Sequence, residues 1–142
     1  MLGNYTLNEV TADASNQKMS VSDTWQNLYR VVLNANVIIS RVDGNDAISN
    51  AVQTSVIANA RFLRALAYWH ITNLWGDAPF YEGVLTLEEI SSLGRTDKNV
   101  ILTSVLKDLE FAQSNLPSVL PNEERGRASK WAAAIIEAKI QM

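Results

Sequence analysis

The chain has 142 residues, about one domain by the usual range of roughly 100–200 residues, and 47% of them are hydrophobic against 19% charged. This composition excludes a disordered tail or a low-complexity spacer. With no cysteine and one histidine, His70, disulfides, thiol catalysis and two-histidine metal sites are excluded. The net charge of −3, without a basic tract, argues against nucleic-acid binding. We also expect no membrane span and no signal peptide in this sequence.

The first 20 residues are polar and rich in turn formers, which predicts an irregular lead-in over residues 1–20. Apolar side chains then recur at steps of three and four, which predicts the first helix over residues 22–42. Its apolar stripe is wide because Val31 and Ile38 add a second edge, and this width indicates contact with more than one neighbour. Gly44 is placed to end the helix.

The second helix is predicted over residues 46–74, with its first residues as a possible separate turn, and Gly76 supplies its stop. Apolar residues fall on two faces of this helix. The first face carries Val56, Ala60, Leu63, Ala67, Ile71 and Leu74, and the second carries Phe62, Leu66 and Trp69.

Residues 75–97 form a long connection that is rich in aromatic residues, a length that is typical of functional or tightly packed loops. The third helix is predicted over residues 98–115, capped by Thr96 or Asp97 and ended by Pro117. The fourth helix runs from about residue 128 to the chain end, where no stop residue follows it. We therefore expect this chain to be a piece of a longer protein.

Helices joined by turns predict antiparallel helical hairpins. The third and fourth helices together have the size of one tetratricopeptide repeat, roughly 34 residues, although the tryptophan, leucine, glycine and tyrosine pattern of that repeat is absent. The predicted fold is therefore all-α, with about four main helices in tetratricopeptide-like hairpins that form one region over residues 1–142.

Four strings of residues follow one another along the chain. They are W-x-x-L-Y from Trp25 with N-A-N from Asn34; A-R-F-L-R-A-L-A-Y-W from Ala60 with L-W-G-D-A-P-F from Leu74; V-x-x-D-L-x-x-A-x-x-x-L-P from Val105, after a loop arginine, Arg95; and G-R-A-S-K-W-A-A from Gly126. In this order, over about residues 22–142, they resemble the N-terminal portion of the SusD/RagB family of outer-membrane nutrient-binding lipoproteins.

The resemblance implies a tetratricopeptide-like scaffold that a lipid anchors to the outer membrane in the full-length protein. It implies a partner, a TonB-dependent SusC-like porin beneath this lid, and an oligosaccharide or peptide ligand that the pair imports. It implies binding without catalysis, cofactor or metal. In the family, the lead-in to the first helix and nearby loops contribute to the ligand pocket. By that resemblance the candidate ligand residues are Asn4, Tyr5, Asn16, Gln17 and Trp75.

Other residues of these strings are interpreted as structural. They are Trp25, Tyr29, Asn36, Arg61, Arg64, Gly76, Asp77, Pro79, Asp108 and Arg127. The two arginines of the second helix can clamp an anion or a sugar, but their core-like neighbours favour pairing with Asp108, Glu110 or loop carbonyls, which holds the third helix against the second.

Asn36 lies on the apolar stripe of the first helix, where a buried amide without partners costs about 1–3 kcal/mol. We expect it to bond to a loop backbone, with the turn at Gly76–Pro79 as the candidate. Trp25, Trp69 and Trp131 are expected to pack inside the protein, because aromatic residues at helical spacing are mostly core.

Two other classes of function remain open. A free-standing helical-repeat adaptor would bind a peptide in its concave groove. A small hydrolase ranks third, because His70 has no catalytic partner in a motif and no spacing indicates a pair of catalytic carboxylates.

Overall fold

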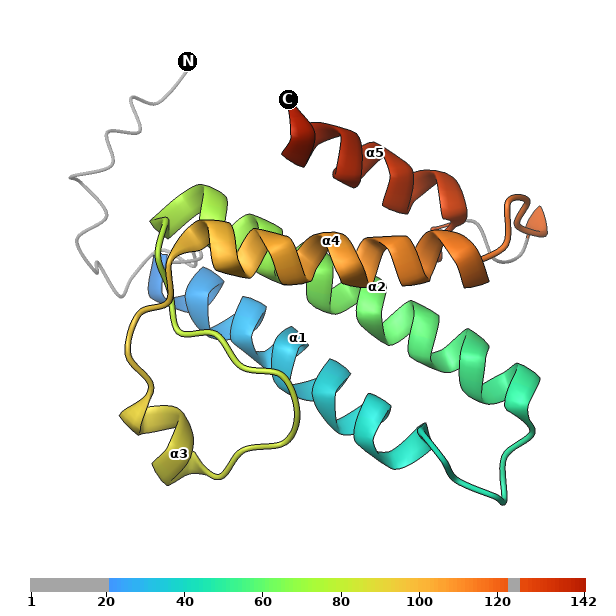
Figure 1. The fold of residues 1–142 in the computed structure, drawn as a ribbon, viewed down its shortest axis with the longest axis horizontal. Helices are drawn as coiled ribbons and strands as arrows, with labels where there is room; N and C mark the ends of the chain where they lie inside the picture. The colour runs from blue at the N-terminus through green and yellow to red at the C-terminus, as the bar shows by residue number, and fades with distance from the viewer. Residues whose placement is uncertain (1–20, 123–125) are drawn as a thin grey trace, which may run out of the picture.

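The computed structural model describes residues 21–122 and 126–142. Five helices follow one another in this part of the chain: α1 (Val21–Val42), α2 (Asn50–Trp75), α3 (Leu87–Ser92), α4 (Lys98–Asn115) and α5 (Lys130–Gln141). Helices α1 and α2 form one antiparallel hairpin and α4 and α5 form a second (Figure 1). The predicted all-α architecture is confirmed, while the lead-in over residues 1–20 lies outside the described residues.

Short polar contacts set where the helices begin and end. After α1, Gly44 takes a positive φ of 69°, and the side chain of Gln53 donates to the carbonyls of Asn45 and Ile48, each at 2.8 Å. This turn delays the start of α2 to Asn50, four residues after the predicted start. At the other end of α2, the N–H of Gly76, at φ 71°, donates to the carbonyl of Thr72 at 3.0 Å.

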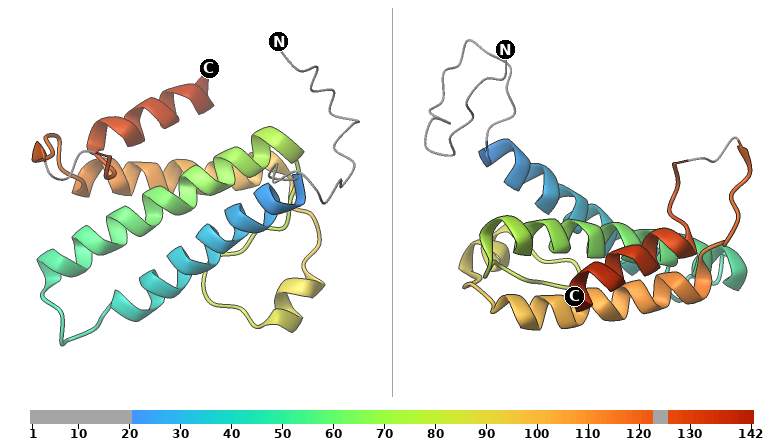
Figure 2. Two further views of the ribbon diagram at one scale, coloured as in Figure 1. Left: turned by 180° about the vertical axis from the view of Figure 1, so that it is seen from behind. Right: turned by 90° about the horizontal axis from the view of Figure 1, so that it is seen from above.

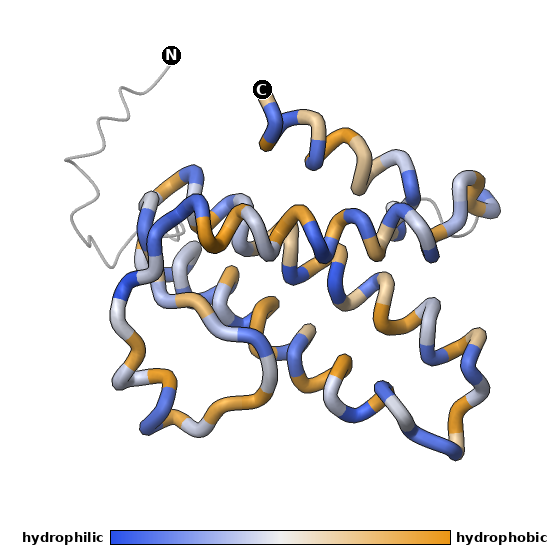
Figure 3. The backbone as a smooth tube through the Cα atoms, viewed as in Figure 1, coloured by the Kyte–Doolittle hydropathy of each residue, from blue (hydrophilic) through white to orange (hydrophobic). Residues whose placement is uncertain are grey.

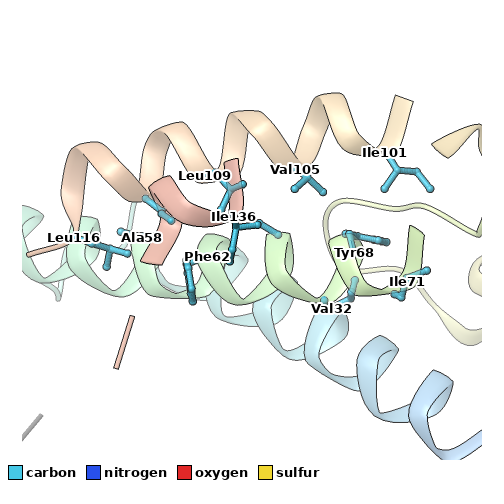
Figure 4. Close-up of a cluster of buried hydrophobic side chains, with 14 of the residues drawn as sticks. Val32, Ala58, Phe62, Tyr68, Ile71, Ile101, Val105, Leu109, Leu116 and Ile136 are labelled. Carbon is cyan, nitrogen blue, oxygen red and sulfur yellow. The ribbon is translucent and has the colours of Figure 1, made fainter. Parts of the chain in front are cut away.

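The central helix of the fold is α2, which packs against α1 on one side and against α4 on the other (Figure 2). Helix α5 in turn covers α4. Side chains from all four long helices meet in one core (Figure 4). Its largest fully buried members are Tyr68, Ile71, Ile101, Leu109, Val32 and Val105. Burying each large apolar side chain contributes roughly 1.5–3 kcal/mol to the free energy of unfolding. This core therefore stabilises the packing of the four long helices against one another.

Several large apolar side chains of the helices are exposed, and two predictions about them are wrong in part. On α2, Leu63 and Leu74 remain 47% and 59% exposed, because α1 and α4 pack on the neighbouring faces around Arg64. On α1, Val31 and Ile38 are also exposed, since the second neighbour of this helix is the connection after α2 and touches a different edge.

The prediction for Trp131 is wrong, because this side chain is 58% exposed on α5 instead of packed. Trp25 and Trp69, by contrast, pack against the core. Along α4, hydrophilic and hydrophobic residues alternate around the helix (Figure 3), as expected for a helix with one face in a core.

The connection from α2 to α4 leaves the helices and returns to them at one place. Ala78 and Thr96 pair as an isolated antiparallel bridge, with N–H to carbonyl distances of 2.9 and 3.2 Å. Asp77 accepts a hydrogen bond from the N–H of Lys98 at 3.0 Å. Between these ends lies α3, whose first turn is closed by a capping box of Thr86 and Glu89. No helix in the described part of the chain combines the length and apolar content needed to cross a bilayer.

Candidate functional site

A groove with a volume of about 370 Å³ lies between the first half of α1 and the connection that follows α2. We call it the aromatic groove. It is lined by Trp25, Gln26, Tyr29, Arg30, Leu33, Pro79, Tyr81 and Ile90. A second hollow, of about 540 Å³, lies between α4 and α5, but its lining is polar and charged apart from Leu106 and includes no aromatic side chain. The aromatic groove is therefore the better candidate for a small-molecule site.

Four aromatic rings in and beside the groove contact one another. Trp25 and Tyr29 lie one turn apart on α1, with ring centroids 4.7 Å apart. The ring of Tyr81 stacks on that of Tyr29 at 6.5 Å and an interplanar angle of 14°. Trp75, at the end of α2, meets Trp25 edge to face at 4.9 Å. Together the rings give the groove an apolar wall with fixed geometry.

Two polar side chains stand on the same stretch of α1. Gln26 and Arg30 lie one turn apart and are both exposed. The amide nitrogen of Gln26 donates to Ser22 at 3.2 Å, which leaves its carbonyl oxygen available to a ligand. Arg30 adds a guanidinium with five N–H donors. Aromatic faces beside these groups suit a ring that has an apolar face and hydroxyls at its edge.

Side chains from the core hold the connection against the groove. The hydroxyl of Tyr29 donates to the carbonyl of Pro79 at 2.7 Å. The hydroxyl of Tyr68 donates to the carbonyl of Tyr81 at 3.0 Å and accepts from its N–H at 3.0 Å. Burial raises the pKa of the Tyr29 and Tyr68 hydroxyls above their ordinary value. Both hydroxyls therefore stay protonated and keep donating even well above neutral pH.

Behind this wall, one buried arginine joins three helices. Arg64 of α2 donates from Nε and Nη2 to the two carboxylate oxygens of Asp108 of α4, at 2.7 and 2.8 Å. Its Nη1 donates to Oδ1 of Asn36 of α1 at 2.7 Å. The amide nitrogen of Asn36 then donates to the carbonyl of Tyr81 at 3.4 Å. The buried ion pair of Arg64 and Asp108 is thereby connected, through Asn36, to Tyr81 of the aromatic groove.

The charges of this network are partly compensated. Burial is the largest single effect on Arg64 and opposes its charge, but the hydrogen bonds to Asp108 and the negative charges of Asp108 and Glu82 together outweigh burial and raise the pKa of Arg64. Burial raises the pKa of Asp108, against the bonds from Arg64 and the charge of Arg61. Glu82, in the connection, lies 3.6 Å from Arg64 and also accepts from Ser104.

The expected pairing of the two α2 arginines with Asp108 is thus confirmed, closely for Arg64 and at a longer distance for Arg61. Arg61 lies 3.8 Å from Asp108, and its guanidinium stacks over the ring of Phe111 at 4.3 Å. Asn36 does bond to a loop backbone, but at Tyr81 and not at Gly76–Pro79, because the chain beyond Pro79 folds back along α1.

Of the candidate ligand residues, Asn4, Tyr5, Asn16 and Gln17 lie outside the described residues. Trp75 is half-buried next to Trp25, beside the groove. These five assignments stay predictions.

Among the residues interpreted as structural, Trp25, Tyr29 and Pro79 line the groove. Asp77 accepts from the first N–H of α4, and Arg127 is exposed before α5.

Sequence reasoning did not single out Gln26, Arg30, Tyr68 or Tyr81 for the site. The first two were detectable, because Gln26 and Arg30 lie four residues apart, as Trp25 and Tyr29 do, and so form a polar face adjoining the aromatic one. Tyr68 and Tyr81 carried no such signal, since their meeting depends on the path of the connection.

Comparisons with known proteins identify the family of the chain and its fold. The profile of a SusD-like family, described as starch-binding and associating with the outer membrane, matches residues 1–142. The SusD-like protein P25 of Formosa agariphila is 65% identical over 141 residues, which are 99% of this chain and 27% of that protein. The chain therefore spans about a quarter of the length of this relative.

Solved structures resemble the fold as well. A SusD-like carbohydrate-binding protein from Bacteroides fragilis aligns with a TM-score of 0.80 and 29% identity, over 92% of this chain and 25% of that one. A laminarin-binding SusD-like protein aligns with a TM-score of 0.77 and 25% identity, over 82% of this chain and 25% of that one. The profile match over the whole chain and these alignments lead to one conclusion: the chain belongs to the SusD-like family.

Proposed function

We propose that the protein binds a glycan at the cell surface without changing it chemically, and that it does so as part of a lid on a TonB-dependent SusC-like importer. The observation that carries the binding proposal is the aromatic groove, in which Trp25, Tyr29 and Tyr81 stand beside the polar side chains of Gln26 and Arg30. The family's description as starch-binding and the carbohydrate-binding relative in Bacteroides fragilis support the ligand class.

The aromatic groove is suited to binding more than to hydrolysis. A sugar places its C–H face on a ring and its hydroxyls on the amide and guanidinium groups. Glycoside hydrolysis requires two carboxyl groups about 5–9.5 Å apart, and no carboxylate is among the described residues that line the groove.

The remaining ligand contacts belong to the same proposal. Trp75 touches Trp25 and extends the aromatic wall toward the end of α2. The four lead-in residues, Asn4, Tyr5, Asn16 and Gln17, are proposed as further contacts, since the lead-in directly precedes α1, which carries the groove. The lipid anchor and the importer are proposed for the protein at its native length.

The experiment that tests the proposal compares Gln26→Ala and Arg30→Ala with the unchanged protein, by calorimetric titration with maltoheptaose and with laminarin. Each variant removes hydrogen-bonding groups from the groove, so we expect each to weaken binding about five- to tenfold. The matched control is Arg41→Ala, which removes an exposed arginine from the last turn of the same helix and leaves the affinity unchanged.

Equal affinity in all three variants would show that the glycan binds elsewhere. If the unchanged protein binds neither probe, nor any member of a wider panel of polysaccharides, the glycan proposal is wrong. Binding of a peptide in the groove in that case would favour the helical-repeat adaptor.

A further inference from the structure

One lining residue of the aromatic groove is fixed by a side chain that lies outside the groove. Tyr81 contributes its ring to the wall, and its backbone N–H and carbonyl both bond to the hydroxyl of Tyr68, each at 3.0 Å. Tyr68 belongs to α2, is 1% exposed and does not line the groove. A single buried hydroxyl therefore satisfies both backbone groups of one wall residue.

Tyr68 is itself held firmly. Its ring lies 6.4 Å from that of Tyr29, edge to face, and 5.0 Å from that of Phe80. It belongs to the core cluster that joins α2 with α1 and α4. Because interiors pack densely and side chains there keep one rotamer, the hydroxyl has a fixed position relative to α1, on which the opposite wall of the groove is built.

The other attachments of the connection act on neighbouring residues. Tyr29 fixes Pro79, and Arg64 and Ser104 contact Glu82. At Tyr81 itself, Asn36 supplies one longer hydrogen bond, at 3.4 Å, to the carbonyl alone. Loss of the Tyr68 hydroxyl therefore leaves Pro79 and Glu82 attached to the helices but removes the partner of the Tyr81 N–H. The backbone of Tyr81 can then rotate, and this rotation determines the position of its ring.

We infer that Tyr68 is a positioning residue for the ligand site: its hydroxyl sets the backbone of Tyr81 so that the Tyr81 ring stacks on Tyr29 and completes the aromatic wall. The inference rests on the proposed function for its effect on glycan affinity. Its effect on the groove itself is independent of any ligand.

The test is Tyr68→Phe, made in the protein at its native length. The substitution keeps the ring in the core and removes only the hydroxyl. The matched control is Thr72→Val, which removes a buried hydroxyl one turn later on α2 that bonds only within the helix, to the carbonyls of Tyr68 and Trp69. Both variants are compared at a temperature at which each is fully folded by circular dichroism.

Two readouts separate positioning from a general loss of stability. The first, by NMR, is the hydrogen exchange of the Tyr81 amide together with the ring-to-ring NOE between Tyr29 and Tyr81. The second is the Kd for maltoheptaose and laminarin. In Tyr68→Phe we expect faster exchange at Tyr81, a weaker NOE and a Kd raised about fivefold. In Thr72→Val we expect the exchange rate, the NOE and the Kd to stay as in the unchanged protein, even if this variant loses as much stability as Tyr68→Phe.

An unchanged NOE and an unchanged Kd in Tyr68→Phe would overturn the inference, as would an equal rise in Kd in Thr72→Val. If the unchanged protein binds no glycan, the proposed function fails by itself. The exchange and NOE measurements still decide in that case whether Tyr68 sets the position of Tyr81.

Discussion

Arg64 is the residue at which the most parts of this fold meet. Its guanidinium bonds to Asp108 of α4 through two nitrogens and to Asn36 of α1 through the third. A buried ion pair of this kind contributes little net stability by itself, because desolvation offsets most of the attraction. Its directional bonds do fix how α1 and α4 are rotated relative to α2, which apolar contacts alone specify less strictly.

Removing one partner of this pair is expected to be costly. In Asp108→Asn, Arg64 keeps its charge in the core and loses the carboxylate that compensates it. We expect the free energy of unfolding to fall by about 3–5 kcal/mol, measured by urea denaturation at neutral pH. The control is Glu110→Gln, which removes an exposed carboxylate from the same helix and is expected to change stability by less than about 0.5 kcal/mol. Similar losses in the two variants would contradict a structural role for the pair.

At the scale of elements, α5 has one face in the core and one face outside it. Ile136 is 8% exposed and belongs to the core cluster, while its neighbour Ile135 is 58% exposed. Trp131, one turn before Ile135, is exposed to the same extent. The packed face and the exposed face of α5 are therefore equally rich in large apolar residues.

The two isoleucines provide a matched test of this orientation in the 142-residue chain. Ile136→Ala leaves a cavity in the core, so we expect it to lower the free energy of unfolding by about 2–4 kcal/mol. Ile135→Ala is expected to change it by less than about 0.5 kcal/mol. Thermal and urea unfolding of both variants measure the difference. A larger loss in Ile135→Ala would mean that α5 is rotated relative to the structure described above.

The elements that could be predicted are those with strong end signals. Helix α4 begins after Asp97, which caps it, and ends before Pro117. Helix α3 went unpredicted although the Thr86 and Glu89 pattern of its capping box is visible in the sequence, because six residues are too few to show an apolar stripe. The exposed faces of α2 and α5 could not be told from buried ones, since both carry large apolar residues.

The candidate site was predictable only in part for a related reason. Trp25 and Tyr29 stand out by their helical spacing, and Trp75 by its place at a helix end. The opposite wall depends on Tyr81, which reaches α1 because the connection folds back to the bridge of Ala78 and Thr96. That path is set by contacts between residues far apart in the chain, and periodicity carries no information about them.

At the scale of the whole molecule, one wall of the groove comes from α1 and the other from the connection after α2. The second hairpin contributes Asp108, the partner of the buried Arg64 behind these walls. The chain spans about a quarter of the relatives reported above. The proposed importer partnership therefore belongs to the protein at its native length.

We predict that a SusC-like porin is encoded beside the gene of this protein and that the two proteins co-purify in detergent. A stable lid needs an interface of more than roughly 1,000 Å², which would survive affinity purification through a tag on the porin. The control is a tagged porin from an unrelated locus. Equal recovery with both porins, or recovery with neither, would argue against the partnership.

The bridge between Ala78 and Thr96 has a consequence for how such proteins diversify. Because its two ends are fastened to each other and Asp77 is fastened to the start of α4, the segment between them is a closed excursion from the helical frame. Loop-closure entropy rises only slowly with length. Residues 79–82 of this segment are held by side chains of the helices, but insertions and deletions beyond Glu82 cost the frame little. Evolution can therefore reshape the side of the groove at Ile90 while leaving the helices, and the opposite wall, as they are.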